Sequence, residues 1–224
     1  AKDLNVDIVL IDTAGIRKKS KVDWGVEKFA VDRAIRAIRS CDVAVLVIDA
    51  LEGLTDQDKK IAQTIIESGR AMILAVNKWD LVENKQENSP QKYEKMLQQE
   101  APFLDYIPKI FISAVTKQRL VYIYQQAIEV HKEWTKRVST STLNKIISEA
   151  FAMNPPNSKR GKRLKILYTT QVKSEPPTFV MFVNNGDLLV DSYRRYLEKR
   201  LREAFGFFGT PIKLTERERK EKDS

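Results

Sequence analysis

The sequence predicts an α/β protein: a doubly wound, parallel-sheet domain over residues 1–136, followed by a small α+β domain over residues 137–216. In the first part, short apolar runs alternate with stretches whose apolar residues recur at helical spacing. In the second part, the predicted order becomes helix, strand, strand, helix, strand. Residues 217–224 are a charged tail in which we expect no packed structure.

The elements of the first domain follow one another as expected for strands joined by helices. We expect buried strands over residues 6–11, 42–49, 71–76 and 109–112, and helices over residues 26–40, 55–68, 91–100 and 118–136. Thr55 and Asp58 have the spacing of a capping box at the start of one helix, and Gly69 suits the position just after its end.

The motif Asn77-Lys78-Trp79-Asp80 directly follows the strand at 71–76. Ligands of open α/β sheets bind at the carboxyl ends of the strands. Asp80 offers two acceptor oxygens to a ring with adjacent N–H and NH2 donors, which describes guanine and excludes adenine. Asn77 can bond to a purine or tie neighbouring loops together, and the stem of Lys78 can lie across a flat base.

A second motif, Asp12-Thr13-Ala14-Gly15, follows the predicted strand at 6–11. An acidic residue in this position can hold Mg2+ through water, and a glycine lets a backbone N–H approach a phosphate. Ile16 stands where a water-orienting Gln is often close by, and it cannot polarise water. We therefore expect slow hydrolysis, or help from an ion, with K+ as the candidate, or from a partner.

The two motifs, in this order, resemble the third and fourth nucleotide-binding motifs of the translation-factor class of GTPases. Ser113-Ala114-Val115 follows the strand at 109–112 and looks like the fifth motif, whose backbone N–H groups meet the guanine O6. The phosphate-loop pattern G-x-x-x-x-G-K-[ST] is not found in the 224 residues. We expect it upstream of this chain, so that the chain alone is inactive as a GTPase.

Composition limits the other classes. No apolar run approaches the length of a membrane span, and a single cysteine, Cys41, excludes an internal disulfide. With one histidine as well, a His/Cys metal site is not expected. The net charge is +9, and residues 137–224 hold 18 Lys and Arg against 10 Asp and Glu, so nearly all the excess lies there. This asymmetry indicates a partner that is a polyanion, most often nucleic acid.

The second domain is expected to contain helices around residues 143–151 and 193–205 and strands at 164–172, 178–183 and 210–215. Its basic residues gather in a loop and along the second helix. The candidates for contact with RNA phosphates are Lys159, Arg160, Lys162, Arg163, Arg194, Arg195, Lys199, Arg200 and Arg202.

The second domain also carries a more specific resemblance. The stretches Ala152-Met153-Asn154-Pro155-Pro156, Arg163-Leu164-Lys165-Ile166 and Ala204-Phe205-Gly206-Phe207, after a GTPase domain, resemble the Der (EngA) family. The resemblance implies a fragment: most of a second GTPase domain, lacking its phosphate loop, and a KH-like domain, with a first GTPase domain repeated upstream. It also implies GTP and GDP binding, a role in assembly of the large ribosomal subunit through rRNA, and a cytoplasmic or organellar location. The G-x-x-G loop of ordinary KH domains is absent.

Two other functions remain open from the residues. The first is an RNA- or ribosome-binding module in which the truncated GTPase fold is only a scaffold, which the missing phosphate loop favours. The second is a phosphate-loop ATPase, which the intact Asn77-Lys78-Trp79-Asp80 motif disfavours.

Overall fold

The computed structural model of the chain describes residues 6–11, 35–83, 89–159 and 161–219. The chain divides into two compact units, Ala1–His131 and Lys132–Ser224. Each unit has its own apolar core, and each is described by itself. In the described parts of the chain, no helix is both long and apolar enough to cross a membrane.

The first unit contains a parallel three-stranded sheet, as predicted. Its strands are β1 (Val43–Asp49), β2 (Ala71–Asn77) and β3 (Lys109–Phe111), in the order β1-β2-β3. Asp49 lies opposite Asn77, and Val76 lies opposite Phe111. The register therefore brings the carboxyl ends of all three strands to one edge of the sheet.

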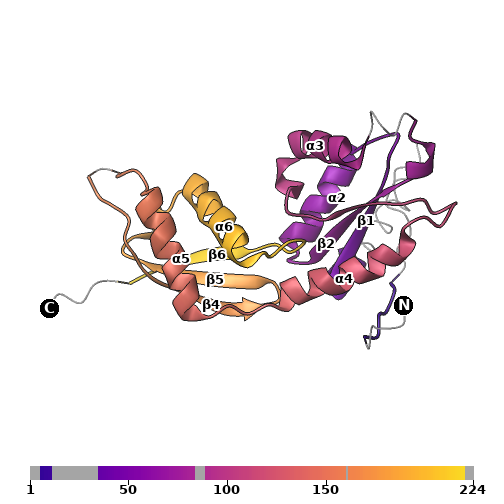
Figure 1. Ribbon diagram of the computed structural model, residues 1–224. Coiled ribbons are helices and arrows are strands. Elements are labelled where there is room, and N and C mark those ends of the chain that lie inside the picture. The colour runs from indigo at the N-terminus through magenta and orange to yellow at the C-terminus, as the bar shows by residue number, and fades with distance from the viewer. Residues whose placement is uncertain (1–5, 12–34, 84–88, 160, 220–224) are drawn as a thin grey trace, which may run out of the picture. The chain divides into compact units, whose positions relative to one another are not determined.

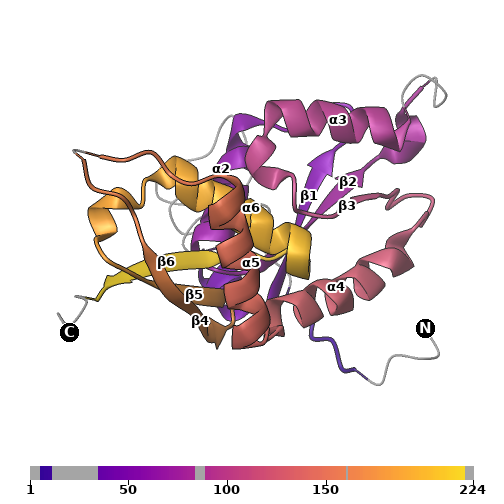
Figure 2. The same ribbon diagram turned by 60° about the vertical axis from the view of Figure 1, so that its left-hand side comes forward.

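Helices connect and cover these strands. They are α2 (Asp56–Glu67), η1 (Trp79–Leu81), α3 (Pro90–Glu100), η2 (Pro102–Leu104) and α4 (Leu120–Thr135), and residues 35–40 are also helical. The predicted capping box is confirmed, since the Thr55 hydroxyl accepts from the Asp58 N–H and the Asp58 carboxylate accepts from the Thr55 N–H. Figure 2 shows α3 and α4 on opposite sides of the sheet, which is the layered arrangement that the sequence predicts.

The central position of β2 in the sheet explains why residues 71–76 are all apolar. Met72, Leu74 and Val76 join a core that includes Ile48 of β1 and Leu97 of α3, while the residues between them are buried as well. A strand buried on both faces has no alternation of apolar and polar residues. Polar side chains begin only where the strand ends, at Asn77.

The predicted strand at residues 6–11 is wrong in this structure. These residues form no strand, and Val9 and Leu10 are 83% and 74% exposed. A strand is stable only when a neighbour accepts and donates its backbone hydrogen bonds, and none of the described strands pairs with this segment. The predicted burial is confirmed for β2 and for Ile110 and Phe111 of β3, whereas Val45 and Val47 of β1 are 39% and 50% exposed.

The second unit has a mixed three-stranded sheet with helices on one face. Its elements are α5 (Thr140–Met153), β4 (Ile166–Ser174), β5 (Pro177–Val183), η3 (Gly186–Leu188), α6 (Asp191–Phe205) and β6 (Lys213–Glu218). β4 and β5 are antiparallel, whereas β5 and β6 are parallel. Figure 1 shows α5 and α6 together above the sheet, and Leu143, Leu197 and Phe179 meet in the core between them. The predicted order of helices and strands is confirmed.

The Asn144 side chain links α5 to the edge strand β4 through two hydrogen bonds. Its side-chain carbonyl accepts from the Thr169 N–H at 2.7 Å, and its amide NH2 donates to the Thr169 carbonyl at 2.8 Å. The same NH2 also donates to the Thr140 carbonyl. An edge strand has backbone groups without a strand partner, so a side chain that satisfies two of them stabilises this edge.

We predict that Asn144→Ala lowers the free energy of unfolding of the second unit by about 1–3 kcal/mol, because two partly buried backbone groups of Thr169 lose their partner. Urea denaturation followed by circular dichroism gives the change in stability. Hydrogen exchange of the Thr169 amide should become faster in the variant. Lys145→Ala, a change at the neighbouring exposed position, is the control, and equal effects of the two changes would contradict the role of Asn144.

Candidate functional site

The loops after β2 and β3 are joined at the carboxyl edge of the first sheet. The Asn77 side-chain oxygen accepts from the Ala114 N–H at 3.0 Å, and the Trp79 N–H donates to the Ile112 carbonyl at 3.0 Å. On the other side, the Ala50 N–H donates to the Asn77 carbonyl at 2.8 Å. Asn77 therefore ties neighbouring loops together, which is one of the two roles that the sequence suggested for it.

Asp80 lies in η1, directly after this junction, and is partly exposed. Among the described residues, its carboxylate has no hydrogen-bond or ion-pair partner. Because two acceptor oxygens stand available beside the Asn77–Ala114 junction, the edge can accept two N–H donors from one side of a flat ring.

Trp79 belongs to the motif that the sequence predicts to bind guanine, but its side chain does not reach the edge of the sheet. Its indole is buried. The centroid of the indole ring lies 4.4 Å from the ring centroid of Phe111 and 5.5 Å from that of Tyr93. The Tyr93 hydroxyl donates to the Ala50 carbonyl. An aromatic ring buried in this way anchors the loop from below and leaves Lys78 and Asp80 at the surface.

Lys78 pairs with Asp49, the last residue of β1. The ammonium lies 2.6 Å from the Asp49 carboxylate, whose side chain is only 6% exposed. Its second oxygen accepts from the Leu51 N–H at 2.9 Å. The hydrogen bond from Lys78 holds the pKa of Asp49 below its ordinary value. Lys78 has a left-handed backbone conformation, with φ of 62°, which is uncommon outside glycine.

Sequence reasoning found the strand that ends in Asp49 but gave this residue no role. Its position could have identified it, because Asp49 is the last residue of β1 just as Asn77 is the last residue of β2. Because the pair crosses from β1 to the loop after β2, it adds a fourth connection at the carboxyl edge, beside the three hydrogen bonds described above.

The segment Ser113-Ala114-Val115 lies at the same edge, as expected. Its N–H groups are partly committed: Ser113 donates to the Gln118 carbonyl at 3.2 Å and Ala114 donates to Asn77. The buried Ser113 hydroxyl accepts from the Thr116 N–H. Contact between these N–H groups and a guanine O6 therefore stays a prediction, and for Ala114 it would share a donor that Asn77 already uses.

The other predicted motif, Asp12-Thr13-Ala14-Gly15 with Ile16, lies outside the described residues. Within the described ranges, no three His, Cys, Asp or Glu side chains group together as a metal site. The roles predicted for this motif, including water-mediated Mg2+ binding by Asp12, stay predictions.

The basic loop of the second unit is exposed. Lys159 and Lys162 exchange backbone hydrogen bonds at 3.0 and 3.1 Å, which makes a tight turn with Gly161 at a φ of 75°. The side chains of Lys159, Lys162 and Arg163 are exposed, whereas Arg160 lies outside the described residues. The Lys159 ammonium donates to the Asp187 carbonyl at 3.4 Å, and the exposed side chains of the turn are open to solvent, as phosphate binding requires.

The cations of α6 divide into two groups. Arg194 donates to the Leu214 carbonyl and to Glu216, both at 2.7 Å, and this contact lowers the pKa of Glu216. Arg202 is mostly buried and donates to the Phe207 and Thr210 carbonyls and to Glu198.

These contacts correct the prediction that Arg194 and Arg202 bind phosphates, because both guanidinium groups join parts of their own domain. Arg200 pairs with Glu203 at 2.6 Å. Arg195 and Lys199 are exposed one turn apart and stay candidates.

Comparisons with known proteins agree with both units. A model described as the elongation factor Tu GTP-binding domain matches residues 5–153, and one described as the KH-domain-like C-terminal domain of EngA bacterial GTPases matches residues 137–217. GTPase Der of Desulforamulus reducens is 46% identical over 215 residues, and that of Listeria welshimeri is 50% identical over 214 residues. The chain belongs to the Der (EngA) family.

The chain spans about half the length of these Der relatives, since it covers 49% of each while 96% of the chain is aligned. Among solved structures, Era in complex with MgGDPNP and a segment of 16S ribosomal RNA is 18% identical and covers 94% of this chain and 76% of its own, with a TM-score of 0.44. A likeness of that degree carries no argument about function.

We predict that the Asp49–Lys78 pair makes the first unit sensitive to acid. Since the pKa of Asp49 is lowered in the folded state, its contribution to stability is present above the ordinary carboxyl pKa of about 4 and is lost as the pH falls through the lowered value. Thermal unfolding measured across this range should show a steeper loss for the wild type than for Asp49→Asn.

Asp56→Asn is the control for this experiment, because Asp56 is almost fully exposed at 3.7 Å from Lys59. It should keep the pH dependence of the wild type. The same pH dependence in Asp49→Asn and in the wild type would contradict the prediction.

Proposed function

We propose that the whole protein, of which this chain is part, binds GTP and GDP at the carboxyl edge of the first unit and hydrolyses GTP. The observation that carries the proposal is the junction of Asn77 with Ala114, beside the Asp80 carboxylate, which has no partner among the described residues. Guanine offers two adjacent N–H donors to such a carboxylate, and adenine does not. The match to a GTP-binding domain over residues 5–153 supports the same assignment.

In this proposal each residue at the edge has its own task. Asp80 selects the base, Asn77 keeps the two loops in register, and the stem of Lys78 lies against the ring while Asp49 holds its ammonium. Trp79 acts only through packing. Asp12 would hold Mg2+ through water, and the ion would neutralise charge on the phosphates. K+ is the second candidate ion, because Ile16 cannot orient the attacking water.

We further propose that the second unit brings the protein to ribosomal RNA of the large subunit in the course of its assembly, in the cytoplasm of a bacterium or inside an organelle. The support is the charge of the unit, its family match and the exposed side chains of Lys159, Lys162 and Arg163. A scaffold without nucleotide chemistry is the second candidate, and the open edge around Asp80 favours the GTPase.

We predict that Asp80→Asn in the full-length protein weakens GDP binding by about 1.5–3 kcal/mol, the scale of a hydrogen bond to a charged group. The reason is that the amide places one donor against the donors of guanine. Xanthine diphosphate, whose exocyclic group is an acceptor, should bind more tightly to the variant. Titration calorimetry with both nucleotides and with ADP measures the change.

Asp105→Asn is the matched control, because this exposed carboxylate precedes β3 at the opposite edge of the sheet. It should leave GDP affinity unchanged. Unchanged GDP affinity in Asp80→Asn would remove the basis for the guanine assignment, and displacement of GDP by ATP would favour an ATPase.

We predict that replacing Lys159, Arg160, Lys162 and Arg163 with Ala weakens binding to rRNA fragments of different sequence by similar factors. Each phosphate contact contributes about 0.7–0.9 to the slope of log affinity against log salt concentration, so the slope should also become shallower. Filter binding across a salt series measures both quantities. Equal affinity and slope in variant and wild type would exclude the turn as a phosphate contact.

A further inference from the structure

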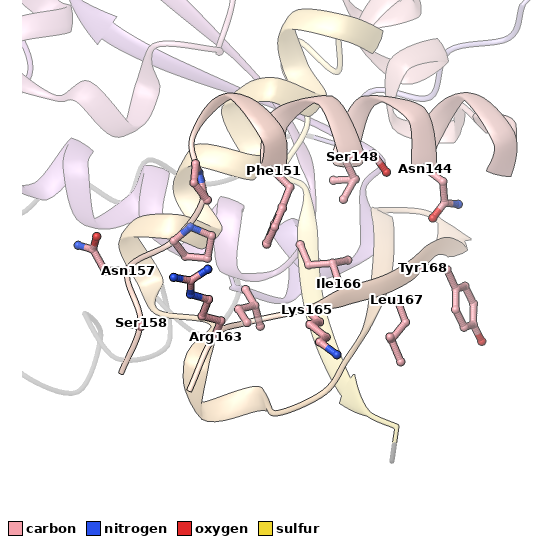
Figure 3. A pocket seen from close by; sticks show the side chains of 14 residues that line it. Asn144, Ser148, Phe151, Asn157, Ser158, Arg163, Lys165, Ile166, Leu167 and Tyr168 are labelled. Atoms are coloured by element: carbon pink, nitrogen blue, oxygen red, sulfur yellow. The ribbon is translucent and has the colours of Figure 1, made fainter. Parts of the chain in front are cut away.

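A groove of about 740 Å3 lies in the second unit between α5 and β4 (Figure 3). One wall is α5, with Ser148 and Phe151, and the other is the chain that enters β4, with Arg163 and Lys165. The loop around Asn157 joins the walls at one end. Sites for small organic groups have volumes of roughly 300–1,000 Å3, so the groove is large enough for such a group.

Phe151 gives the groove an aromatic wall. Figure 3 shows its ring directed from α5 toward the opposite wall. The ring is half-buried, and the edge-on ring of Tyr193, 6.5 Å away, supports it. Aromatic side chains on rigid elements are the platforms on which unpaired bases stack, whatever the base.

Hydrogen-bonding groups flank this ring. The Ser148 hydroxyl and the Asn157 amide both line the groove and are exposed, and neither has a partner among the described residues. Together they offer donors and acceptors to the edge of a planar ring. A purely apolar occupant would leave these groups without partners.

The charge at the groove favours an anion. None of the 14 described residues that line it is acidic, while Arg163 and Lys165 stand on one wall. The exposed turn with Lys159 and Lys162 is part of the same stretch of chain, directly between Ser158 and Arg163 of the lining. An occupant with a ring for the groove and phosphates for the turn satisfies both features.

We propose that this groove binds an unstacked base of single-stranded RNA, stacked on Phe151, while Arg163, Lys165 and the adjoining turn hold the flanking phosphates. The inference rests on the proposed RNA binding of the second unit and adds a site that recognises bases. Only unpaired nucleotides can place a base in such a groove, so single strands should bind more tightly than duplexes of equal charge.

The test uses the 224-residue chain with Ser148→Trp, which fills the groove and leaves every cation in place. Three labelled probes are compared by fluorescence anisotropy: a short unstructured RNA, its duplex, and inorganic polyphosphate, which has no bases. Loss of one stacked base corresponds to a decrease in affinity of about fivefold or more. We expect this loss for the single strand only, with an unchanged salt slope.

Ser192→Trp, the same change at an exposed position of α6 outside the groove, is the control and should bind all three probes as the wild type does. Asn157→Ala, in an exposed loop, provides a second variant that preserves the core and should also weaken single-strand binding. Circular dichroism and the thermal midpoint report whether each variant is folded. Wild-type affinity for the single strand in both groove variants would overturn the proposal.

The variant with Lys159→Ala and Lys162→Ala separates this inference from the proposed function. If the turn binds phosphates, this variant weakens RNA and polyphosphate alike and lowers the salt slope. No effect there, with a clear effect of Ser148→Trp on RNA, would reject the phosphate role and keep the groove. An effect of Ser148→Trp on an acidic peptide, but not on RNA, would identify the groove as a peptide site and reject the base.

Discussion

The hydrogen bond between the Asn77 side chain and the Ala114 N–H is the contact on which the candidate site depends. Parallel strands deliver their carboxyl ends to one edge, but they leave the loops beyond that edge free to diverge. A side-chain amide at the end of the central strand offers a hydrogen-bond donor and an acceptor just beyond the sheet. It can therefore bond to the loop that follows the neighbouring strand. Asp80 is positioned only because this junction and the buried ring of Trp79 hold the residues before it.

The Asp49–Lys78 pair completes the edge on the side of β1. A carboxylate that is almost fully buried is costly unless it is paired, and Asp49 has both an ammonium and the Leu51 N–H. The lysine therefore has two tasks in the proposed site: its ammonium neutralises Asp49, and its stem remains exposed at the surface where a base would lie. This arrangement is consistent with its uncommon left-handed backbone.

In the second unit, the number of cations in a segment does not predict which of them are available to bind a ligand. Along α6, Arg194 and Arg202 satisfy backbone carbonyls and carboxylates of their own domain, whereas Arg195 and Lys199 point away from it. A guanidinium has five donors and often binds carbonyls at the ends of elements. In the turn, Lys159, Lys162 and Arg163 are exposed, although the Lys159 ammonium also donates to the Asp187 carbonyl. With the groove beside them, these cations form the better candidate surface.

The sequence by itself determined the order of helices and strands in the described chain from β1 onward, because the apolar runs and the capping residues are local patterns. It also placed Asn77, Asp80 and Ser113 at strand ends, since polar residues after a buried strand mark the carboxyl edge. Only the tertiary structure decided which of the predicted site residues face solvent: Trp79 is buried, Arg194 and Arg202 are committed internally, and Asp49 joins the site. It also decided that residues 6–11 have no strand partner among the described residues. These outcomes depend on contacts between segments far apart in the chain, and a pattern within one segment carries no information about its partner.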